Sequence, residues 1–181
     1  MNKRTRYLWL QGTIATVAIL ACSDDADSPT GPTSARAPAL ATAAAPIPPF
    51  YQVSGGNNHT CGVTPENRIL CWGVGMFGDG TGYGYDPRPP VRVAGTYSFH
   101  QVSSGYYHTC AVTTGQRLYC WGRNYDGQIG DGTRTDRTRP VLIGGGRLFR
   151  QVDAGIAHTC AIASADNKAY CWGGQCKGQA G

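Results

Sequence analysis

The sequence predicts an all-β fold of repeated, blade-like units, and three observations lead to this fold class. Residues 105–122 return with clear self-similarity at 56–73 and at 155–173, about 50 residues apart. The chain holds 26 Gly and 11 Pro, and only 15% of its 181 residues are charged, which suits short strands joined by tight turns. No long stretch after residue 50 shows sustained helical periodicity. A fixed period of this length indicates an array with one supersecondary unit per repeat.

The chain begins with a segment typical of an export signal. Three basic residues precede residues 7–21, a mostly apolar stretch that is too short to span a bilayer comfortably. The segment ends in Ile-Leu-Ala-Cys, which resembles the bacterial lipobox, whose cysteine is lipidated and becomes the first mature residue. We therefore expect residues 1–22 to be a lipoprotein signal peptide and Cys22 to carry a lipid anchor. An ordinary cleaved signal is the alternative.

Residues 23–49 are dominated by Ala, Pro, Ser, Thr and Asp. Such a segment cannot bury enough apolar surface to fold, so we expect a disordered tether. A tether directly after a lipidated cysteine would hold the folded part away from the membrane.

Each repeat reads Phe-x-Gln-Val, then Gly-x-x-His-Thr-Cys, a polar turn and Cys-Trp-Gly. In the middle copy this pattern predicts two strands joined by turn chemistry at residues 113–116, with a further strand before them and one after the Gly-rich connection. The expected strands of that copy are, in order, residues 99–103, 108–112, 117–121 and 140–143, and the last is matched by residues 90–93 in the first copy. About four strands per ~50 residues is the content of a β-propeller blade.

These motifs resemble the regulator-of-chromosome-condensation (RCC1-type) repeat family. Its signature is Gly-x-x-His-Thr, then Trp-Gly-x-Asn-x-x-Gly-Gln-x-Gly, then Asp-Gly-Thr. The middle copy carries all of it between Gly105 and Thr133, whereas the first copy lacks three residues of the Gly-Gln-x-Gly part. The third copy reaches Gly-Gln-Ala-Gly at residues 178–181.

The resemblance implies a seven-bladed propeller of four-stranded blades. Residues 50–181 would supply about two and a half blades, at about 50–98, 99–148 and an incomplete 149–181. We therefore expect a partial propeller, a fragment of a longer protein whose C-terminal blades are missing here.

The chain has eight cysteines, and six of them form matched pairs at the same places of the three copies. Each pair brackets a turn, so its members fall opposite each other in a hairpin, within reach of a disulfide. Zinc is the alternative, because each copy also offers His-x-Cys, although no fourth ligand can be named. Cys176 has no partner in this scheme. Since export favours an oxidising compartment, we predict the disulfides Cys61–Cys71, Cys110–Cys120 and Cys160–Cys171.

The net charge of +5 does not indicate nucleic-acid binding. Lys3, Arg4 and Arg6 lie in the expected signal peptide, which leaves an excess of only two basic residues for the rest of the chain. No basic stripe is visible.

No catalytic, cofactor or metal site can be named, and we expect a protein that is not an enzyme. His59, His108 and His158 occur once per copy, whereas a catalytic base belongs to a single constellation. We expect them to be structural, for example by hydrogen bonding to a neighbouring turn. The tryptophans of the Cys-Trp-Gly segments are expected to fill each blade. None of the Gly-rich segments has the Gly-x-x-x-x-Gly-Lys pattern that cradles phosphate.

Function is expected where the copies differ, because the recurring positions build the scaffold. Between Gly and His the middle copy has Tyr106 and Tyr107, where the others have Asn-Asn and Ile-Ala. The longer connections also diverge, and the first copy places Tyr83, Tyr85 and Arg88 there. Tyr and Arg are typical of recognition surfaces. These five residues are the candidate partner-binding positions, and the alternative is that variable loops are simply unconstrained.

The leading interpretation is a non-enzymatic protein-binding module exported to the bacterial cell envelope and held there by a lipid anchor, or secreted in soluble form. Within the resembled family one branch inhibits β-lactamases through aromatic residues on the propeller face, which favours a protein partner. Two alternatives are guanine-nucleotide exchange on a small GTPase, as in the family's nuclear founder, and an accessory module of a larger enzyme. Export argues against the first, because its partner is intracellular.

Overall fold

The computed structural model describes residues 48–174. The expected signal peptide, lipidation at Cys22, nearly all of the tether and Cys176 lie outside the described residues. All regular secondary structure in residues 48–174 is β. Accordingly, this part of the chain contains no helix with the length and hydropathy of a membrane span.

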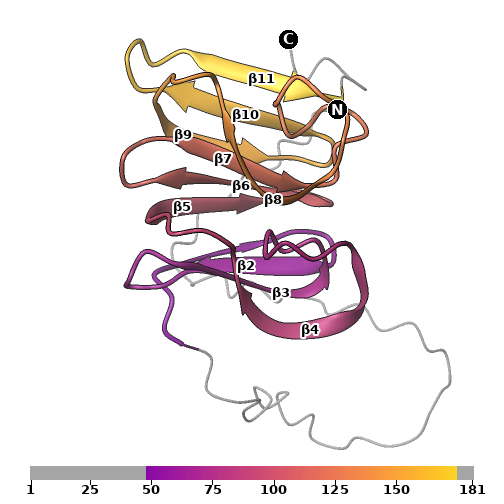
Figure 1. The fold of residues 1–181 in the computed structure, drawn as a ribbon. Coiled ribbons are helices and arrows are strands. Elements are labelled where there is room, and N and C mark those ends of the chain that lie inside the picture. The colour runs from indigo at the N-terminus through magenta and orange to yellow at the C-terminus, as the bar shows by residue number, and fades with distance from the viewer. Residues whose placement is uncertain (1–47, 175–181) are drawn as a thin grey trace, which may run out of the picture. The chain divides into compact units, whose positions relative to one another are not determined.

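The strands form three antiparallel sheets, each a simple meander, which we call blades 1 to 3 (Figure 1). Blade 1 contains β1 (Gln52–Gly55), β2 (His59–Val63), β3 (Ile69–Gly75) and β4 (Gly84–Arg92). Blade 2 contains β5 (Phe99–Ser104), β6 (His108–Thr113), β7 (Leu118–Gly122) and β8 (Arg137–Ile143). The described part of blade 3 contains β9 (Phe149–Ala154), β10 (His158–Ala163) and β11 (Ala169–Gly173).

Blade 2 lies between the other two, with β5 against β1 and β2, and with β9 against β5 and β6 (Figure 1). In a meander, the turn between the first and second strands and the connection between the third and fourth strands lie at the same end of the sheet. The all-β, partial-propeller prediction agrees with this architecture.

The fourth strands begin earlier than the pattern predicts. β4 starts at Gly84, because Gly75 pairs with Gly84 and Gly73 with Arg88 across two irregularities in the ladder. β8 likewise starts at Arg137, which pairs with Gly122. Apart from Gly84, these early residues are polar or exposed, so the sequence shows no hydrophobic alternation there.

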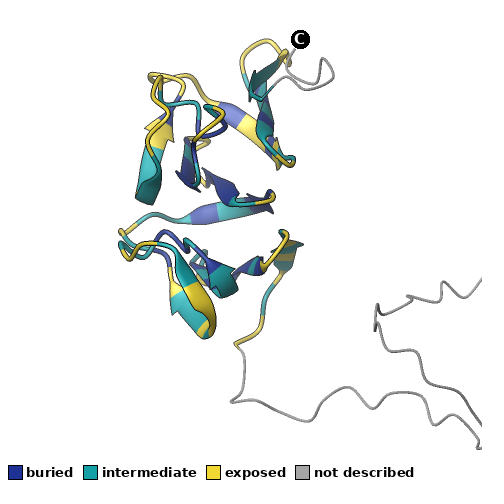
Figure 2. Ribbon diagram, turned by 90° about the vertical axis from the view of Figure 1, so that its right-hand side faces the viewer, coloured by how far each residue is buried: buried dark blue, intermediate teal, exposed yellow. Residues whose placement is uncertain are grey.

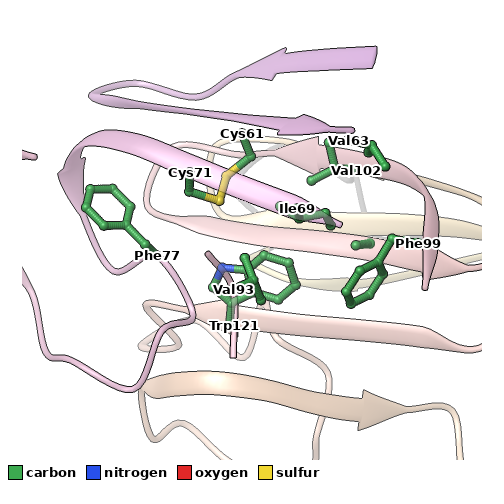
Figure 3. Packing of buried hydrophobic residues seen from close by; sticks show 10 residues of the cluster. Cys61, Val63, Ile69, Cys71, Phe77, Val93, Phe99, Val102 and Trp121 are labelled. Atoms are coloured by element: carbon green, nitrogen blue, oxygen red, sulfur yellow. A yellow bond between two sulfur atoms is a disulfide. The ribbon is translucent and has the colours of Figure 1, made fainter. Parts of the chain in front are cut away.

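The hydrophobic core lies mainly where the blades face one another. Ile69 and Val93 of blade 1 pack in one cluster with Phe99 and Trp121 of blade 2 (Figure 3). The Trp121 side chain is fully buried, as expected for a blade-filling tryptophan. A second cluster joins blade 2 to blade 3 in the same way. Exposed residues lie in the turns and also along parts of the strands, above all β4 (Figure 2).

The structure joins the three predicted cysteine pairs as disulfides, Cys61–Cys71, Cys110–Cys120 and Cys160–Cys171. In each pair the residues stand directly opposite in the ladder, with Cα atoms 4.1 Å apart. With the sulfur atoms bonded to each other, no thiolates are left in these pairs for the zinc alternative. Among the described residues, no group of three or more His, Cys, Asp or Glu side chains is arranged to hold a metal ion.

The repeated histidines join neighbouring blades. His59 Nε2 lies 2.8 Å from Thr109 Oγ1, and His108 Nε2 lies 2.9 Å from Thr159 Oγ1. The Thr159 hydroxyl donates to the carbonyl of Gln128 at 2.8 Å, so it must accept its other hydrogen bond from His108 Nε2–H. The expected structural role is therefore a bond to the next blade's strand rather than to a turn.

Burial lowers the pKa of His59 and of His108 to about 4, and for His108 the neighbouring histidines His59 and His158 add to the effect. His108 Nδ1 is buried and has no hydrogen-bond partner within residues 48–174. The backbone of His158 opposes the lowering of the His108 pKa, but burial outweighs it and favours the neutral ring.

The glutamines of the Phe-x-Gln-Val segments form a second set of joints. The Gln52 amide donates to the carbonyl of Val102 at 3.0 Å and accepts from the amide of Val102 at 2.9 Å. Gln101 makes the same pair of bonds with Val152 of blade 3. Each glutamine thus continues the hydrogen bonding of its blade into the next one.

Glycine at the start of the Gly-x-x-His turn is required by close packing. A Cβ atom at Gly105 would collide with the carbonyl of Gly155 in the next blade and with the ring of His108. The same conflict arises at Gly56, with the carbonyl of Gly105 and the ring of His59. These glycines let neighbouring blades approach at the end where the turns gather.

Candidate functional site

The candidate site lies at the blade end that holds the Gly-x-x-His turns and the long connections. Four of the candidate side chains are in ring contact there. The rings of Tyr83 and Tyr85 lie 5.0 Å apart between centroids, and those of Tyr83 and Tyr107 lie 6.1 Å apart. Tyr106 packs edge-on against Tyr107 at 4.4 Å. The four predicted tyrosines, from two blades, therefore form one continuous aromatic surface.

Arg88, the fifth candidate, has a different environment. Its guanidinium donates to Asp79 at 2.8 Å and to the Thr81 hydroxyl at 2.8 Å, and it lies over the ring of Phe77. Arg137 makes the equivalent ion pair with Asp131 in blade 2, at 2.6 Å. These matching contacts indicate that Arg88 braces the Asp-Gly-Thr turn, so we assign it to the scaffold.

The pKa values of Asp79 and Asp131 reflect the hydrogen bonds that hold these turns. Burial raises the pKa of Asp131, but hydrogen bonds from the Thr133 side chain and backbone and from Arg137 outweigh it, and the net pKa is lowered. Asp79 follows the same balance through the corresponding residues of blade 1.

Two residues that were not among the candidates complete the surface. The Arg123 guanidinium lies over the ring of Tyr107, 5.2 Å from its centroid, and over the ring of Tyr125, at 4.4 Å. Both residues follow Trp-Gly in the middle copy, where the copies again differ, since Val74 and Gly174 stand in place of Arg123. The divergence that pointed to Tyr106 and Tyr107 could therefore have found Arg123 as well.

The backbone at this position is the same in all three blades. The amide of Arg123 donates to the carbonyl of Tyr107 at 2.9 Å. Val74 and Gly174 donate to the carbonyls of Asn58 and Ala157 in the same way, both at 2.7 Å. The scaffold thus presents one variable side chain at a fixed place.

The tyrosines and the arginine surround a pocket of about 310 Å³, which we call the tyrosine pocket. The Tyr85 side chain is 85% exposed and Tyr125 is 57% exposed, so the pocket opens to solvent. Its lining consists of Met76, Tyr83, Tyr85, Tyr107, Arg123, Tyr125 and Asp136.

The loop that carries Tyr125 is stiffened by the buried side chain of Asn124. The Asn124 amide donates to the carbonyls of Thr133 and Thr135, and its oxygen accepts from the amide of Ile129. The backbone amide of Asn124 donates to Asp136 Oδ1 at 2.8 Å. This network sets the position of the pocket wall before any partner binds.

The Tyr107 hydroxyl stays protonated at neutral pH. Its pKa is raised, chiefly by the hydrogen bond with Tyr106, then by burial and by the neighbouring Tyr106 and Tyr83 hydroxyls, although Arg123 opposes the shift. The pocket therefore offers tyrosine hydroxyls and ring faces, the guanidinium of Arg123 and the carboxylate of Asp136.

A larger cavity, of about 620 Å³, lies between blades 2 and 3 and is lined by Ile143, Phe149, Tyr170 and Trp172 among others. In the corresponding region between blades 1 and 2 lies β8, the fourth strand of blade 2. Its Thr138 carbonyl accepts a hydrogen bond from the amide of Gly80 in blade 1. The described part of blade 3 has no such strand. By comparison with the region at β8, the larger cavity corresponds to the position of a fourth strand. We therefore do not treat it as a ligand site.

The three repeats match a known protein family. The Regulator of chromosome condensation (RCC1) repeat is matched at residues 50–78, 99–128 and 149–179, and a second profile of the same description matches 116–162. Together these matches cover more than half of the chain. The chain belongs to the RCC1 repeat family.

Several solved structures share this fold. Human WBSCR16 matches with a TM-score of 0.61 at 21% identity, over 70% of this chain and 33% of that one. Yeast RCC1 (Prp20), solved with Kap60 bound, matches with a TM-score of 0.55 at 21% identity, over 70% and 32% of the two chains. The receptor kinase CR4 ectodomain of Physcomitrella patens matches with a TM-score of 0.50 at 24% identity, over 70% and 29%. The RCC1 repeats here span about a third of those chains. No curated protein sequence matches this chain.

The RCC1 signature and the aromatic surface use different residues. The repeated Gly, His and Thr positions join the blades, and Asp-Gly-Thr closes the turns. The tyrosine pocket is built from positions that vary between the RCC1 repeats of this chain, apart from the scaffold that supports them.

Proposed function

We propose that this chain is a protein-binding module whose partner docks on the tyrosine pocket and the adjacent Tyr106. The observation that carries the proposal is the convergence of Tyr83, Tyr85, Tyr107 and Tyr125 from two blades at one exposed surface. Isolated apolar side chains are common on protein surfaces, but a contiguous aromatic group marks interaction sites. Tyrosines also supply contact area at a low cost in conformational entropy.

Two features support a macromolecular partner over a small ligand. The surface extends beyond the pocket through Tyr85 and Tyr106, which are 85% and 39% exposed. Proteins of this fold also have protein partners. Yeast Prp20 was solved with Kap60, and its binding to Gsp1p and histones has been described. Those partners belong to Prp20, and the partner of this chain has to be found from its own surface.

We further propose that the module is exported to the bacterial cell envelope and anchored through Cys22. The support is the lipobox-like ending at Cys22 and the three disulfides, which are typical of oxidising compartments. A surface module on a tether would meet its partner outside the cytoplasm.

Replacing Tyr106 and Tyr107 together with Ala tests the binding proposal. The Tyr106 amide donates to the carbonyl of Gly155 in blade 3, and the Tyr107 carbonyl accepts from the amide of Arg123 within blade 2. Alanine at both positions keeps these backbone groups. We expect the double variant to fold and to weaken capture of the partner from an envelope extract by roughly 2 kcal/mol or more, as for tyrosines at a binding hot spot.

A matched control carries Asn at both positions, which is the pair that blade 1 uses at 57 and 58. It should fold equally well and lose binding equally. If the folded variants capture the same partner as strongly as the wild type, the partner does not use this surface.

A further inference from the structure

The guanidinium of Arg123 differs from those of Arg88 and Arg137. Arg88 and Arg137 form ion pairs with aspartates in their own turns. Arg123 forms neither an ion pair nor a side-chain hydrogen bond with any residue in 48–174, and its contacts are the rings of Tyr107 and Tyr125. A charged group with five donors is thus held by aromatic contacts with its hydrogen-bonding capacity unused by the described chain.

We propose that Arg123 is the anchor of the partner-binding surface and receives the carboxylate of an Asp or Glu side chain on the partner. This inference rests on the proposed binding function and names the chemistry of the partner. A planar guanidinium fork binds a carboxylate through two parallel N–H···O bonds, which is the geometry that lysine lacks. The two rings restrict Arg123 before binding, so less side-chain entropy is lost when the pair forms.

The surroundings of Arg123 favour an acidic side chain set among apolar or aromatic neighbours. Met76, Tyr83 and Tyr125 line the same pocket and offer apolar contact beside the charge. A pocket of about 310 Å³ has room for a side chain of the partner, not for a whole folded element. We infer an acidic residue on a protruding segment of the partner, flanked by aromatic side chains.

The charge of Asp136 predicts how its substitution should change the binding of a charged peptide. Its carboxylate lines the same pocket and accepts the Asn124 amide through Oδ1, but it is not paired with Arg123. Its charge should oppose an incoming carboxylate and assist an incoming cation. Asp136→Asn keeps the acceptor for the Asn124 amide and removes the charge, so it should strengthen binding of an acidic probe.

The probes are three synthetic peptides, acetyl-Gly-Phe-Asp-Phe-Gly-amide and its counterparts with Asn or Lys in the centre. Binding to the full chain is followed by the NMR signals of the arginine Nε–H groups and of the backbone. We expect the Asp peptide to bind about tenfold more tightly than the Asn peptide, since charge-assisted hydrogen bonds are roughly twice as strong as neutral ones. The Lys peptide should bind most weakly.

Arg123→Val is the matched variant, because Val74 occupies this place in blade 1 with the same backbone hydrogen bond. It should abolish the preference for Asp over Asn while leaving the spectrum of the remaining chain unchanged. Arg123→Lys should retain a weaker preference, because the charge remains without the fork. Asp136→Asn should tighten binding of the Asp peptide by a few-fold.

The proposal would be overturned by equal binding of the Asp and Asn peptides to the wild type, by tighter binding of the Lys peptide, or by an unchanged preference in Arg123→Val. Failure of all three peptides to bind the wild type would do the same. These outcomes are separate from the proposed function, which fails only if the tyrosine variants keep the partner. If the tyrosine variants lose the partner but Arg123→Val still captures it, the partner uses this surface but Arg123 is not its carboxylate anchor.

Discussion

His59 and His108 show how a repeated residue can resemble a catalytic one in sequence and be wholly structural. Each ring is buried and bonded to a threonine of the next blade. The histidine recurs in every copy because each joint between described blades uses one histidine and one threonine. The same recurrence argued against a catalytic base.

These histidines predict a loss of stability in mild acid. In the folded state the pKa of each is lowered to about 4, whereas an unfolded histidine titrates near 6.5. The unfolded chain therefore binds more protons between these values, and stability is full above about pH 6.5 and falls as the pH drops toward 4. The loss should be at most on the order of 3 kcal/mol per histidine.

Urea unfolding at a series of pH values measures this loss. The double variant His59→Gln, His108→Gln should be less stable at pH 7.5 but should show a flatter profile between pH 6.5 and 4. Asp79 and Asp131, whose pKa values are lowered, add a separate loss at lower pH, below the ordinary range of an aspartate. A wild-type profile that is flat down to pH 4 would show that these rings are not buried as described.

Gln116 predicts a stabilising substitution. It has a φ of 60°, in the left-handed region, and the equivalent residues Asn67 and Asn167 have φ values of 59° and 57°. Asparagine tolerates this region better than glutamine does. Gln116→Asn should therefore raise the free energy of unfolding by a few tenths to about 1 kcal/mol. Chemical denaturation checks it, and Asn67→Gln, the reverse change, should be destabilising by a similar amount.

At the scale of the strands, the disulfide in each central hairpin predicts a local contribution to stability. Cys110 and Cys120 are separated by 10 residues in sequence. Closing a loop of this length should stabilise the fold by roughly 2–3 kcal/mol in the chain-entropy model. Cys110→Ser with Cys120→Ser should lower the unfolding free energy by about that amount, measured by denaturation of the oxidised proteins.

Mass spectrometry of the unreduced, digested wild type should show the three links between neighbouring cysteines. Stability of the serine variant equal to that of the wild type would mean that packing alone holds the hairpin. Free thiols with stoichiometric zinc would revive the metal alternative.

The strands and hairpins could be predicted from sequence to within a few residues, because apolar alternation and turn residues are local signals. β5, β6 and β7 begin and end close to the expected positions. The early starts of β4 and β8 could not be predicted, since their first residues pair through irregular ladders and face solvent.

At the scale of the whole molecule, the differences among the copies led to four tyrosines that lie together in the structure and to Arg88, which pairs with Asp79 instead. Arg88 lies in a divergent stretch, yet its aspartate partner recurs at the same place in blade 2, a relation that is hidden by the different loop lengths. Arg123 was missed although the copies also differ at its position, where Val74 and Gly174 stand in the other blades. Its contacts with the rings of Tyr107 and Tyr125 depend on the fold and could not be predicted from the sequence.

Anchoring through Cys22 is a prediction about the molecule as a whole. If the lipobox-like ending is functional, the wild type should sediment with membranes and incorporate labelled fatty acid. Cys22→Ser should move it to the soluble fraction without affecting the repeats. A wild type that is already soluble and carries no fatty acid would contradict the anchor.

The disulfides have a consequence for biogenesis. In each described pair a cysteine is joined to the next cysteine along the chain, Cys61 to Cys71, Cys110 to Cys120 and Cys160 to Cys171. A chain threaded through a translocation pore from its N-terminal end would expose each pair together, before the following pair emerges. Oxidation in order of emergence would then yield the native pairing directly. For these three bonds a thiol oxidase would suffice, and no isomerase would be needed to correct them.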